Sequence, residues 1–379
     1  MQTNEIELGA VITDIAAGPF GSNLKVSSFV DSGFPIVDGA NLKGYKVTDN
    51  ITKFVTEEKA RSLHRSIAHR GDVVVTISGT VGQISYIPED SQYSEYLCSQ
   101  RQFRATFDTS RVYVPYLVFY FHTYEGQHKI LSFANQTGVP ALAQPLKNFR
   151  QIRLRLPEFM EQRKIASVIE KINDKIEKNE AINHNLEQQA FALFDYLFPN
   201  ISDGLCTIGD YITPKRGRNL LSKDAVPGTV PVVAGGLEPS TYHNIANTLA
   251  PVLTISASGA NAGFVNLWHT PVWSSDSSFI DSSMTEDVYF WFVMLKKRQR
   301  EIFDAQTGSA QPHIYPQHIA AMTIRSLDKA LMSDFASQVT PLFALIGANK
   351  DENDRLASVR DALLPKLMSG EIDVSKVEI

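Results

Sequence analysis

The sequence predicts an α+β protein in which two similar domains are separated by two long helices, giving the chain an internal pseudo-two-fold repeat. Three observations lead to this prediction. Apolar residues recur at heptad spacing in two stretches that lie 170 residues apart. The polar interruptions also match, because Asn179 and Asn183 correspond to Asn349 and Asn353. A similar pair of predicted strands precedes each stretch.

The heptad stretches are the strongest signal, and their stripes define the seam along which two helices are expected to pack. In the first stretch the seam comprises Ile165, Ile169, Ile172, Ile176, Asn179, Asn183, Leu186, Leu193 and Leu197. In the second it comprises Leu342, Ile346, Asn349, Asn353, Leu356, Leu363 and Leu367. Ala190, Phe335 and Val339 continue the same stripes. Two such seams on one chain predict a helix pair of the coiled-coil type.

Each stretch would form a rod about 50 Å long, because roughly 35 residues rise by about 1.5 Å each. The Asn pairs lie near the middle of both rods, so antiparallel helices would bring them level with each other. A buried Asn layer costs stability but fixes register and orientation. The alternative is two ordinary amphipathic helices, each packed on its own domain, but such helices usually have about 8–20 residues. We therefore favour a spacer that holds two domains a fixed distance apart.

The chain accordingly divides into a first domain (head one), a central spacer helix, a second domain (head two), a C-terminal spacer helix and a tail. Their predicted bounds are 1–157, 158–198, 199–327, 328–372 and 373–379. Pro157 and Pro199 bracket the central helix as start and stop signals. Gly370 stands where the C-cap of the second helix is expected.

Both heads combine strands and helices in the same order. Residues 71–87 and 250–265 each contain a β-branched run, a Ser-Gly turn, a short loop ending in Gly and a second β run. This pattern predicts two strands joined by a tight connection. Aromatic-rich helices are expected at 115–134 and 287–305, Gln-Thr-Gly triplets stand at 136–138 and 306–308, and further strands are expected at 152–154 and 322–324.

The composition is that of an ordinary globular protein, with 43% hydrophobic and 20% charged residues. We find no run of about 18 apolar residues, and the first residues lack the pattern of a signal peptide. The two cysteines, Cys98 and Cys206, are too few for a disulfide framework or a four-thiolate zinc site. We therefore expect a cytoplasmic protein that does not enter a membrane.

The net charge of −5 argues at first sight against nucleic acid as a partner. Most of the excess acid lies in the predicted helices, since residues 1–158 hold 16 Lys and Arg against 15 Asp and Glu, and residues 199–330 hold 10 against 11. Any basic footprint in the heads must therefore be local. If the chain binds DNA, it should do so weakly alone and rely on partners for phosphate contacts.

No constellation of residues suited to catalysis is present. The chain has no Pro-Pro step of an amine-methylating DNA enzyme and no Gly-x-x-x-x-Gly-Lys-Ser/Thr phosphate loop, and Gly235-Gly236 fits a turn better than a cofactor loop. Asp49 with Glu57-Glu58-Lys59 matches the metal-binding carboxylates of a nuclease only loosely. His64 and His69 lack a third ligand at helical spacing. We expect no catalytic residue, no metal site and no cofactor on this chain.

The remaining signals are residue types suited to recognition. The candidates in head one are Ser22, Asn23, Lys25, Arg61, Arg65 and Arg70, and those in head two are Lys215, Arg216, Arg218 and Asn219. The second group forms the densest basic loop, in which Gly217 would let the backbone approach a ligand closely. Arg and Lys suit guanine edges or phosphates, while Asn and Gln suit adenine. The alternative is that these are solvated turns and exposed helix faces.

Several longer motifs point to one family. The strongest are Leu156-Pro157-Glu158 followed by Glu161-Gln162-Arg163-Lys164-Ile165, and the segment from Leu363 to Ile372 (LLPKLMSGEI). Weaker ones are Gly18-Pro19-Phe20-Gly21-Ser22, Gly71-Asp72-Val73, the run from Ser78 to Gly82, and the Gln-Thr-Gly triplets. On these motifs the chain resembles, over essentially its whole length, the specificity (S) subunits of type I restriction–modification systems. One departure is that the second helix opens with Asp328-Lys329-Ala330, where a Pro-Glu…Gln step is usual.

The resemblance implies two target-recognition domains, held apart by an antiparallel helix pair, that each read one half of a split, asymmetric sequence in double-stranded DNA. It also implies two modification (methyltransferase) subunits that bring S-adenosylmethionine, and restriction (translocase) subunits that use ATP and Mg²⁺. The chain itself would be non-catalytic. Two alternatives are a specificity module for another DNA modification enzyme and a coiled-coil scaffold whose helices bind protein. Salt-sensitive binding of duplex DNA by the complex would separate the DNA-binding possibilities from the scaffold.

Overall fold

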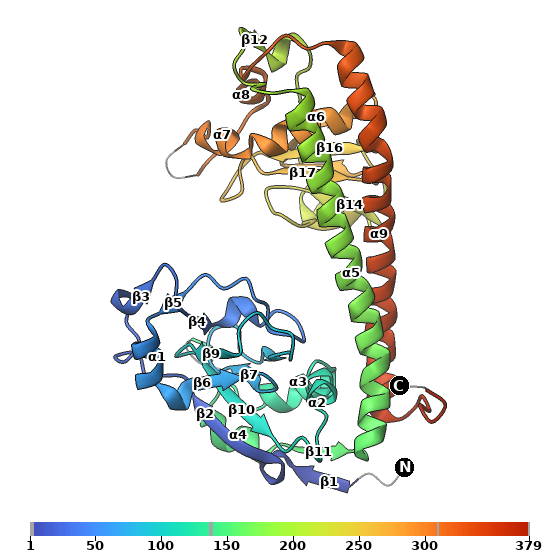
Figure 1. The fold of residues 1–379 in the computed structure, drawn as a ribbon. Helices are drawn as coiled ribbons and strands as arrows, with labels where there is room; N and C mark the ends of the chain where they lie inside the picture. Colours follow the sequence, from blue (N-terminus) through green and yellow to red (C-terminus); the bar gives the residue numbers. More distant parts are fainter. Residues whose placement is uncertain (1–3, 136–138, 309–310, 378–379) are drawn as a thin grey trace. The chain divides into compact units, whose positions relative to one another are not determined.

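The structure is a computed structural model that describes residues 4–135, 139–308 and 311–377. The chain folds into two compact units. Unit 1 contains the residues up to 174 together with those from 356 onward, and unit 2 contains residues 175–355. Each unit therefore consists of one head and part of each long helix (Figure 1).

Head one is built on an antiparallel sheet in the order β2-β10-β7-β8. These strands are Ile12–Ala17, Gln102–Phe107, Val73–Thr76 and Ile84–Tyr86. A second sheet, in the order β3-β5-β4-β9-β6, comprises Phe29–Val30, Phe54–Val55, Phe34–Val37, Glu95–Cys98 and Ile67–His69. A third sheet pairs β1 (Asn4–Glu7) with β11 (Arg153–Leu156) and so joins the start of the head to its end. The strand pair expected at 71–87 is thus β7 with β8.

The helices of head one are α1 (Glu57–Ser62), α2 (Val114–Phe121), α3 (Tyr124–Leu131) and α4 (Pro145–Gln151). The single helix expected at 115–134 was therefore wrong, because α3 starts afresh after Thr123. The Thr123 hydroxyl accepts a hydrogen bond of 3.1 Å from the Gly126 amide, which is an N-cap. An added Cβ at Gly126 would collide with the Tyr120 carbonyl oxygen, so glycine permits the sharp junction.

Head two repeats this plan. Its antiparallel sheet has the order β13-β19-β16-β17, with strands Lys215–Arg216, Ser277–Asp281, Val252–Ser256 and Val265–Trp268. Its smaller sheets are β15-β14-β18 (Thr241–His243, Val230–Val233, Trp273–Ser274) and β12-β20 (Cys206–Thr207, Thr323–Ile324). The helices are α6 (Val288–Lys297), α7 (Gln299–Asp304) and α8 (Pro316–Ala320). The helix expected at 287–305 is likewise interrupted, at Arg298, whose guanidinium bonds Glu301 at 2.6 and 2.8 Å.

Short 3-10 turns complete both heads. They span Leu8–Ala10, Val26–Ser28, Gly39–Asn41 and His64–Ser66 in head one, and Ile208–Asp210 and Ser222–Asp224 in head two. The triplet Gln136-Thr137-Gly138 lies outside the described residues. Its counterpart in head two forms a bridge, in which the Thr307 and His313 backbones bond each other at 2.8 and 3.0 Å.

The repeat extends to single backbone hydrogen bonds, which recur at equivalent places in the two heads. Gly18 N donates to Gln102 O at 2.8 Å, and Gly217 N donates to Ser277 O at the same distance. Three further bonds of head one have a counterpart in head two. Ile77 N donates to Arg101 O as Ala257 N donates to Asp276 O, and Ser99 N donates to Val37 O as Ser275 N donates to Val233 O. In the same way, Gly79 N donates to Pro140 O and Gly259 N donates to Pro312 O. The heads therefore share one backbone frame, and the α+β class and the internal repeat are confirmed.

The two long helices are α5 (Phe159–Leu197) and α9 (Lys329–Ser369), close to the bounds expected from the sequence. Gly370 has a φ of +76° directly after α9, as a C-cap requires. Within unit 2, Asn179 bonds Asn353 and Asn349 bonds Asn183, both at 2.8 Å. Residue numbers fall on α9 as they rise on α5, so the two helices run antiparallel.

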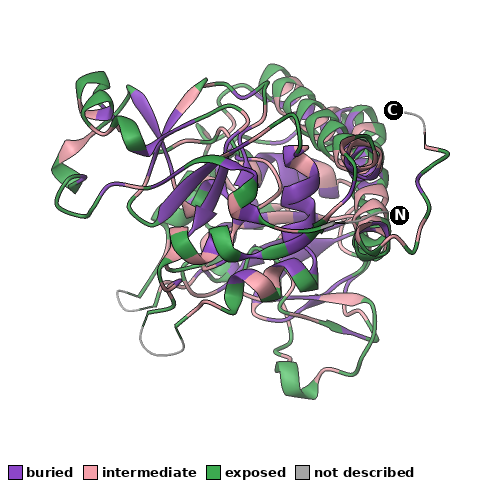
Figure 2. Ribbon diagram, turned by 90° about the horizontal axis from the view of Figure 1, so that it is seen from below, coloured by how far each residue is buried: buried purple, intermediate pink, exposed green. Residues whose placement is uncertain are grey.

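The seam residues are all buried or half-buried, and Ile165, Ile169 and Asn179 are among the most buried. Near head two a different set of α5 residues faces the interior. Ala190, Phe194 and Phe198 are buried there, while Leu193 and Leu197 of the predicted seam are half-buried. The reason is a second partner, since the Phe194 and Phe198 rings contact Phe290 of α6 as well as Phe335 of α9. Buried residues likewise gather in the strands and inner helices of the heads, while the long helices keep exposed outer faces (Figure 2).

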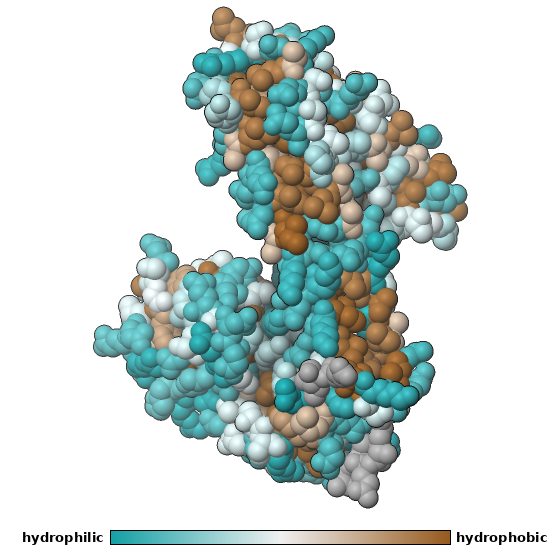
Figure 3. All heavy atoms as spheres, turned by 45° about the vertical axis from the view of Figure 1, so that its right-hand side comes forward, coloured by the Kyte–Doolittle hydropathy of each residue, from teal (hydrophilic) through white to brown (hydrophobic). Residues whose placement is uncertain are grey.

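By length and composition alone, α9 is apolar enough to cross a membrane. Its apolar stripe has another explanation, because Phe335, Val339 and Phe343 belong to the core of unit 2. A core helix of a soluble protein passes the same criterion. Hydrophilic side chains also interrupt the surface of the helix pair on the face seen in Figure 3. Packing within the protein therefore accounts for Phe335, Val339 and Phe343 of α9.

Candidate DNA-recognition surface

Head one has a polar cleft of about 600 Å³ where the loops after β4, β7 and β9 meet. Gln102 and Thr76 lie buried at its base, and the Gln102 amide nitrogen donates to the Thr76 hydroxyl at 3.3 Å. The Thr76 hydroxyl donates in turn to the Gln83 side-chain oxygen at 3.2 Å, and the Ser99 hydroxyl donates to Gln102. These bonds orient the amides, so the cleft presents fixed donors and acceptors.

The rim of this cleft carries Gln100 and Arg101, both exposed. Across the described residues the Arg101 guanidinium has no ion-pair partner, and it lies beside Gly79, which has a φ of +90°. Arg101 also lines an adjoining cleft together with Phe20, whose side chain is 84% exposed. An exposed aromatic ring beside a free guanidinium is a combination suited to nucleic acid.

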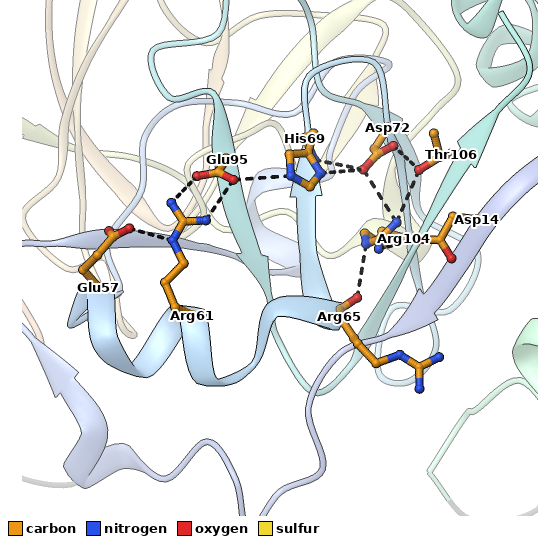
Figure 4. Close-up of polar contacts among 9 residues, drawn as sticks. All are labelled: Asp14, Glu57, Arg61, Arg65, His69, Asp72, Glu95, Arg104 and Thr106. Carbon is orange, nitrogen blue, oxygen red and sulfur yellow. Dashed lines mark hydrogen bonds and ion pairs between the residues drawn. The ribbon is translucent and has the colours of Figure 1, made fainter.

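The loop candidates of head one lie near these clefts. Ser22, Asn23 and Lys25 are exposed on the segment before β3, and Asn23 lines a third cleft together with Phe20 and Arg65. Figure 4 shows the Arg65 side chain pointing away from the neighbouring ion pairs, with only its backbone oxygen accepting a bond from Arg104 at 3.2 Å. These residues therefore remain available to a ligand.

Arg61, in contrast, is bound by acidic neighbours. Its guanidinium bonds both oxygens of Glu95, at 3.0 and 2.6 Å, and Glu57 at 2.8 Å (Figure 4). The Glu95 carboxylate, followed by that of Glu57, raises the pKa of Arg61. Arg70 donates to the Ser91 carbonyl oxygen at 2.6 Å. Both side chains therefore already bond within head one, and a DNA contact by Arg61 or Arg70 stays a prediction.

The basic segment of head two departs from the sequence interpretation, because Lys215 and Arg216 form strand β13 rather than a loop. They pair with Phe279 and Ser278 of β19 and keep exposed side chains. An added Cβ at Gly217 would collide with Ser274, so the close approach that glycine permits is to the protein's own strand.

The side chains on β13 and directly after it lie beside the loop before β19. Arg216 forms an ion pair of 2.5 Å with Asp276, and the Ser258 hydroxyl donates to the same carboxylate. Arg218 and Asn219 are exposed, and the Trp273 indole donates to the Arg218 carbonyl oxygen at 2.8 Å. The structure thus places Lys215, Arg216, Arg218 and Asn219 on one exposed edge of head two.

Similar proteins agree with these features. Residues 29–188 match the family described as "Type I restriction modification DNA specificity domain". The chain is 22% identical to the type I restriction enzyme MjaIX specificity subunit of Methanocaldococcus jannaschii, in an alignment that covers 97% of this chain and 93% of that protein. It is also 22% identical to S.MpnORF638P of Mycoplasma pneumoniae, over 79% of this chain and 83% of that protein.

Residues 29–188 belong to the specificity domain of type I restriction–modification systems. The fold of the chain matches the crystal structure of a type I restriction–modification S subunit from M. genitalium with a TM-score of 0.57 at 15% identity, covering 97% and 96% of the two chains. The function of the chain is therefore recognition of a DNA sequence. S subunits are generally non-catalytic.

The described part of this chain contains no group of three or more His, Cys, Asp or Glu that could hold a metal ion. His69 instead lies 3.3 Å from Glu95 and 3.7 Å from the buried Asp72 (Figure 4). Burial raises the pKa of Cys98 to about 12, which keeps its thiol protonated.

Sequence reasoning missed four polar residues at these surfaces. Gln83, Gln100 and Arg101 line the polar cleft of head one, and Asp276 of head two pairs with Arg216. The signal that could have found three of them is positional, because Gln100, Arg101 and Asp276 directly precede β10 or β19 in the repeated frame. Gln83 follows the Ser-Gly turn between β7 and β8.

Proposed function

We propose that head one and head two read separate halves of a split, asymmetric DNA target, and that α5 and α9 set the gap between the halves. The observation that carries this proposal is the shared backbone frame with different polar side chains. Two such frames on one chain can present equivalent surfaces to the pseudo-two-fold DNA duplex. Different side chains in equivalent places then read different bases.

Catalysis would belong to partners in the cytoplasm. Two modification subunits would bring S-adenosylmethionine and methylate the target, and restriction subunits would translocate and cut DNA with ATP and Mg²⁺. This division is supported by a sequence without a phosphate loop or a Pro-Pro methylation step. The charge balance of the heads also supports it, because a near-neutral head needs partners for phosphate contacts.

The decisive experiment maps modified bases in genomic DNA from cells that carry this gene and from cells in which it is deleted. A split motif with a fixed gap that disappears on deletion and returns with the complementing gene would support the proposal. A one-part motif, or a motif that persists after deletion, would contradict it. If the two maps are identical and unmodified, co-purification of methyltransferase subunits with the chain tests the partnership separately.

A further inference from the structure

The shared frame identifies which side chains occupy equivalent places in the two heads. Because Ile77 N bonds Arg101 O as Ala257 N bonds Asp276 O, Arg101 corresponds to Asp276. Because Gly18 N bonds Gln102 O as Gly217 N bonds Ser277 O, the residue before each glycine also corresponds. Ala17 of head one therefore matches Arg216 of head two.

Each head has a guanidinium at this place, but it comes from a different segment of the chain in each head. In head one it comes from Arg101, at the turn before β10, and Ala17 lies at the edge of the same cleft. In head two it comes from Arg216 on β13, and the residue equivalent to Arg101 is Asp276, which bonds Arg216 at 2.5 Å. The guanidinium therefore lies at the same place in the shared frame of both heads, although different segments carry it.

The surroundings leave room for a ligand at both places. Gly79 and Gly259 correspond in the frame and have φ values of +90° and +81°. An added Cβ at Gly259 would meet open space, and one at Gly79 would have only the Arg101 guanidinium near it, at 3.7 Å. The Arg101 guanidinium thus borders a glycine turn directly, whereas Gly259 directly follows Ser258, which bonds the carboxylate that pairs with Arg216.

A guanidinium can form two parallel hydrogen bonds with the O6 and N7 atoms of guanine. A carboxylate that accepts from one edge of the guanidinium holds its plane and leaves its other N–H groups free. Ser258 donates to the Asp276 carboxylate and so fixes the carboxylate itself. The Arg216 side chain is 41% exposed despite this pair, so its remaining donors are accessible.

We propose that Arg101 and Arg216 each read one guanine, in the half-sites of head one and head two respectively, and that Asp276 is the positioning residue for Arg216. This inference rests on the proposed function and deepens it. It assigns the ligand of each site as the major-groove edge of a G·C pair. It also predicts that both half-sites contain a G·C pair at equivalent distances from the gap.

For head one, the test is base-modification mapping with Arg101→Ala and, as matched control, Arg153→Ala. Arg153 is an exposed arginine on β11 that pairs with Glu7 and lines neither cleft. We expect Arg101→Ala to relax one G·C position by roughly tenfold, in one half-site only. Arg153→Ala should leave the motif unchanged. A uniform loss of methylation with no relaxed position would identify Arg101 as a phosphate contact and overturn the assignment.

For head two, Arg216→Ala should relax one G·C position in the other half-site. Asp276→Asn should relax the same position to a smaller extent and add nothing in the Arg216→Ala background, because it acts through Arg216. Asp276→Glu should restore part of the discrimination. Relaxation at a different position by Asp276→Asn would contradict the positioning role. Equal thermal midpoints of the purified variant complexes establish that folding is intact. If every variant keeps the wild-type split motif, the assignment of Arg101 and Arg216 to guanines is refuted, while the proposed function stands.

Discussion

The side-chain amide of Asn179 donates a hydrogen bond of 2.8 Å to the side-chain oxygen of Asn353. Asn349 makes the same bond, also at 2.8 Å, to Asn183. In the repeat Asn349 is the counterpart of Asn179, and Asn183 is the counterpart of Asn353. The two bonds are therefore related by the pseudo-two-fold axis of the helix pair. A slip of one helix along the other would break both at once, so this layer fixes the register.

Replacing Asn179 by Ala should destabilise unit 2 by about 1–3 kcal/mol, because its buried amide also bonds Glu352 at 2.7 Å and the partners would lose their bonds. Hydrogen exchange of α5 and α9 amides around the Asn layer should quicken. Asn185→Ala is the matched control, since Asn185 is exposed on the same helix. Equal protection in the two variants would show that the layer contributes nothing.

Gln162 should be a second polar anchor, for head one. It is fully buried and bonds three backbone groups: its amide nitrogen donates to Arg111 O and Pro157 O at 2.9 Å, and its oxygen accepts from Tyr113 N at 2.8 Å. Gln162→Ala would leave these groups unpaired, so we expect a loss of about 2–3 kcal/mol in denaturant unfolding of unit 1. The exposed Gln188 on the same helix provides the control variant.

The residue equivalent to Gln162 in the repeat shows which features of the two long helices could be predicted from the sequence. Met332, 170 residues later, is buried in the apolar core of unit 2, so the second helix starts on hydrophobic packing where the first starts on hydrogen bonds. The altered motif at 328–330 indicated a difference, and the heptads predicted the helices themselves. Periodicity could not reveal that Phe194 and Phe198 pack on α6, because that contact depends on the tertiary placement of head two.

The candidate site was harder to predict for a similar reason. Exposed basic residues were visible in the sequence, but their partners were not, so Arg61 was indistinguishable from Arg65. Arg61 meets Glu95 through a contact between residues 34 positions apart. Arg101 and Asp276 became recognisable only when the hydrogen bonds of the two heads were aligned.

The stability of unit 2 should fall in mild acid because of His269. Burial, followed by the nearby Lys350 charge, lowers the pKa of His269 to about 4. A histidine whose pKa is lower in the folded state stabilises the fold above its unfolded pKa of about 6.5. That stability is lost progressively as the pH falls from about 6.5 to 4, by about 2–3 kcal/mol in total.

The His269 prediction is checked by measuring unfolding between pH 7 and pH 4. His269→Asn cannot titrate, so it should remove most of this dependence, although the ring packs closely against Gly347 and its loss costs some stability at every pH. His184 is exposed on α5, and His184→Asn serves as the control that keeps the wild-type profile. A pH slope that persists in His269→Asn would assign the effect to another group.

The basic edge of head two should act on one half-site. Changing Lys215, Arg216 and Arg218 together to Ala should weaken or relax only the half-site that head two reads, because all three lie on the exposed surface around β13. Base-modification mapping measures both halves at once. If both halves degrade equally, these residues are general phosphate contacts or support the fold.

The spacer function makes the sharpest geometric prediction. Four residues inserted after Asn183 in α5, together with four before Asn349 in α9, lengthen both helices on the head-two side of the Asn layer, because Asn183 and Asn349 are level with each other. The addition is about one helical turn, or roughly 6 Å. At about 3.4 Å per base pair, the gap in the modified motif should grow by one or two base pairs while both half-sites keep their sequences. Inserting four residues after Lys376, in the tail beyond α9, should leave the gap unchanged. An unaltered gap in the double insertion, with methylation retained, would show that the helices do not set the spacing.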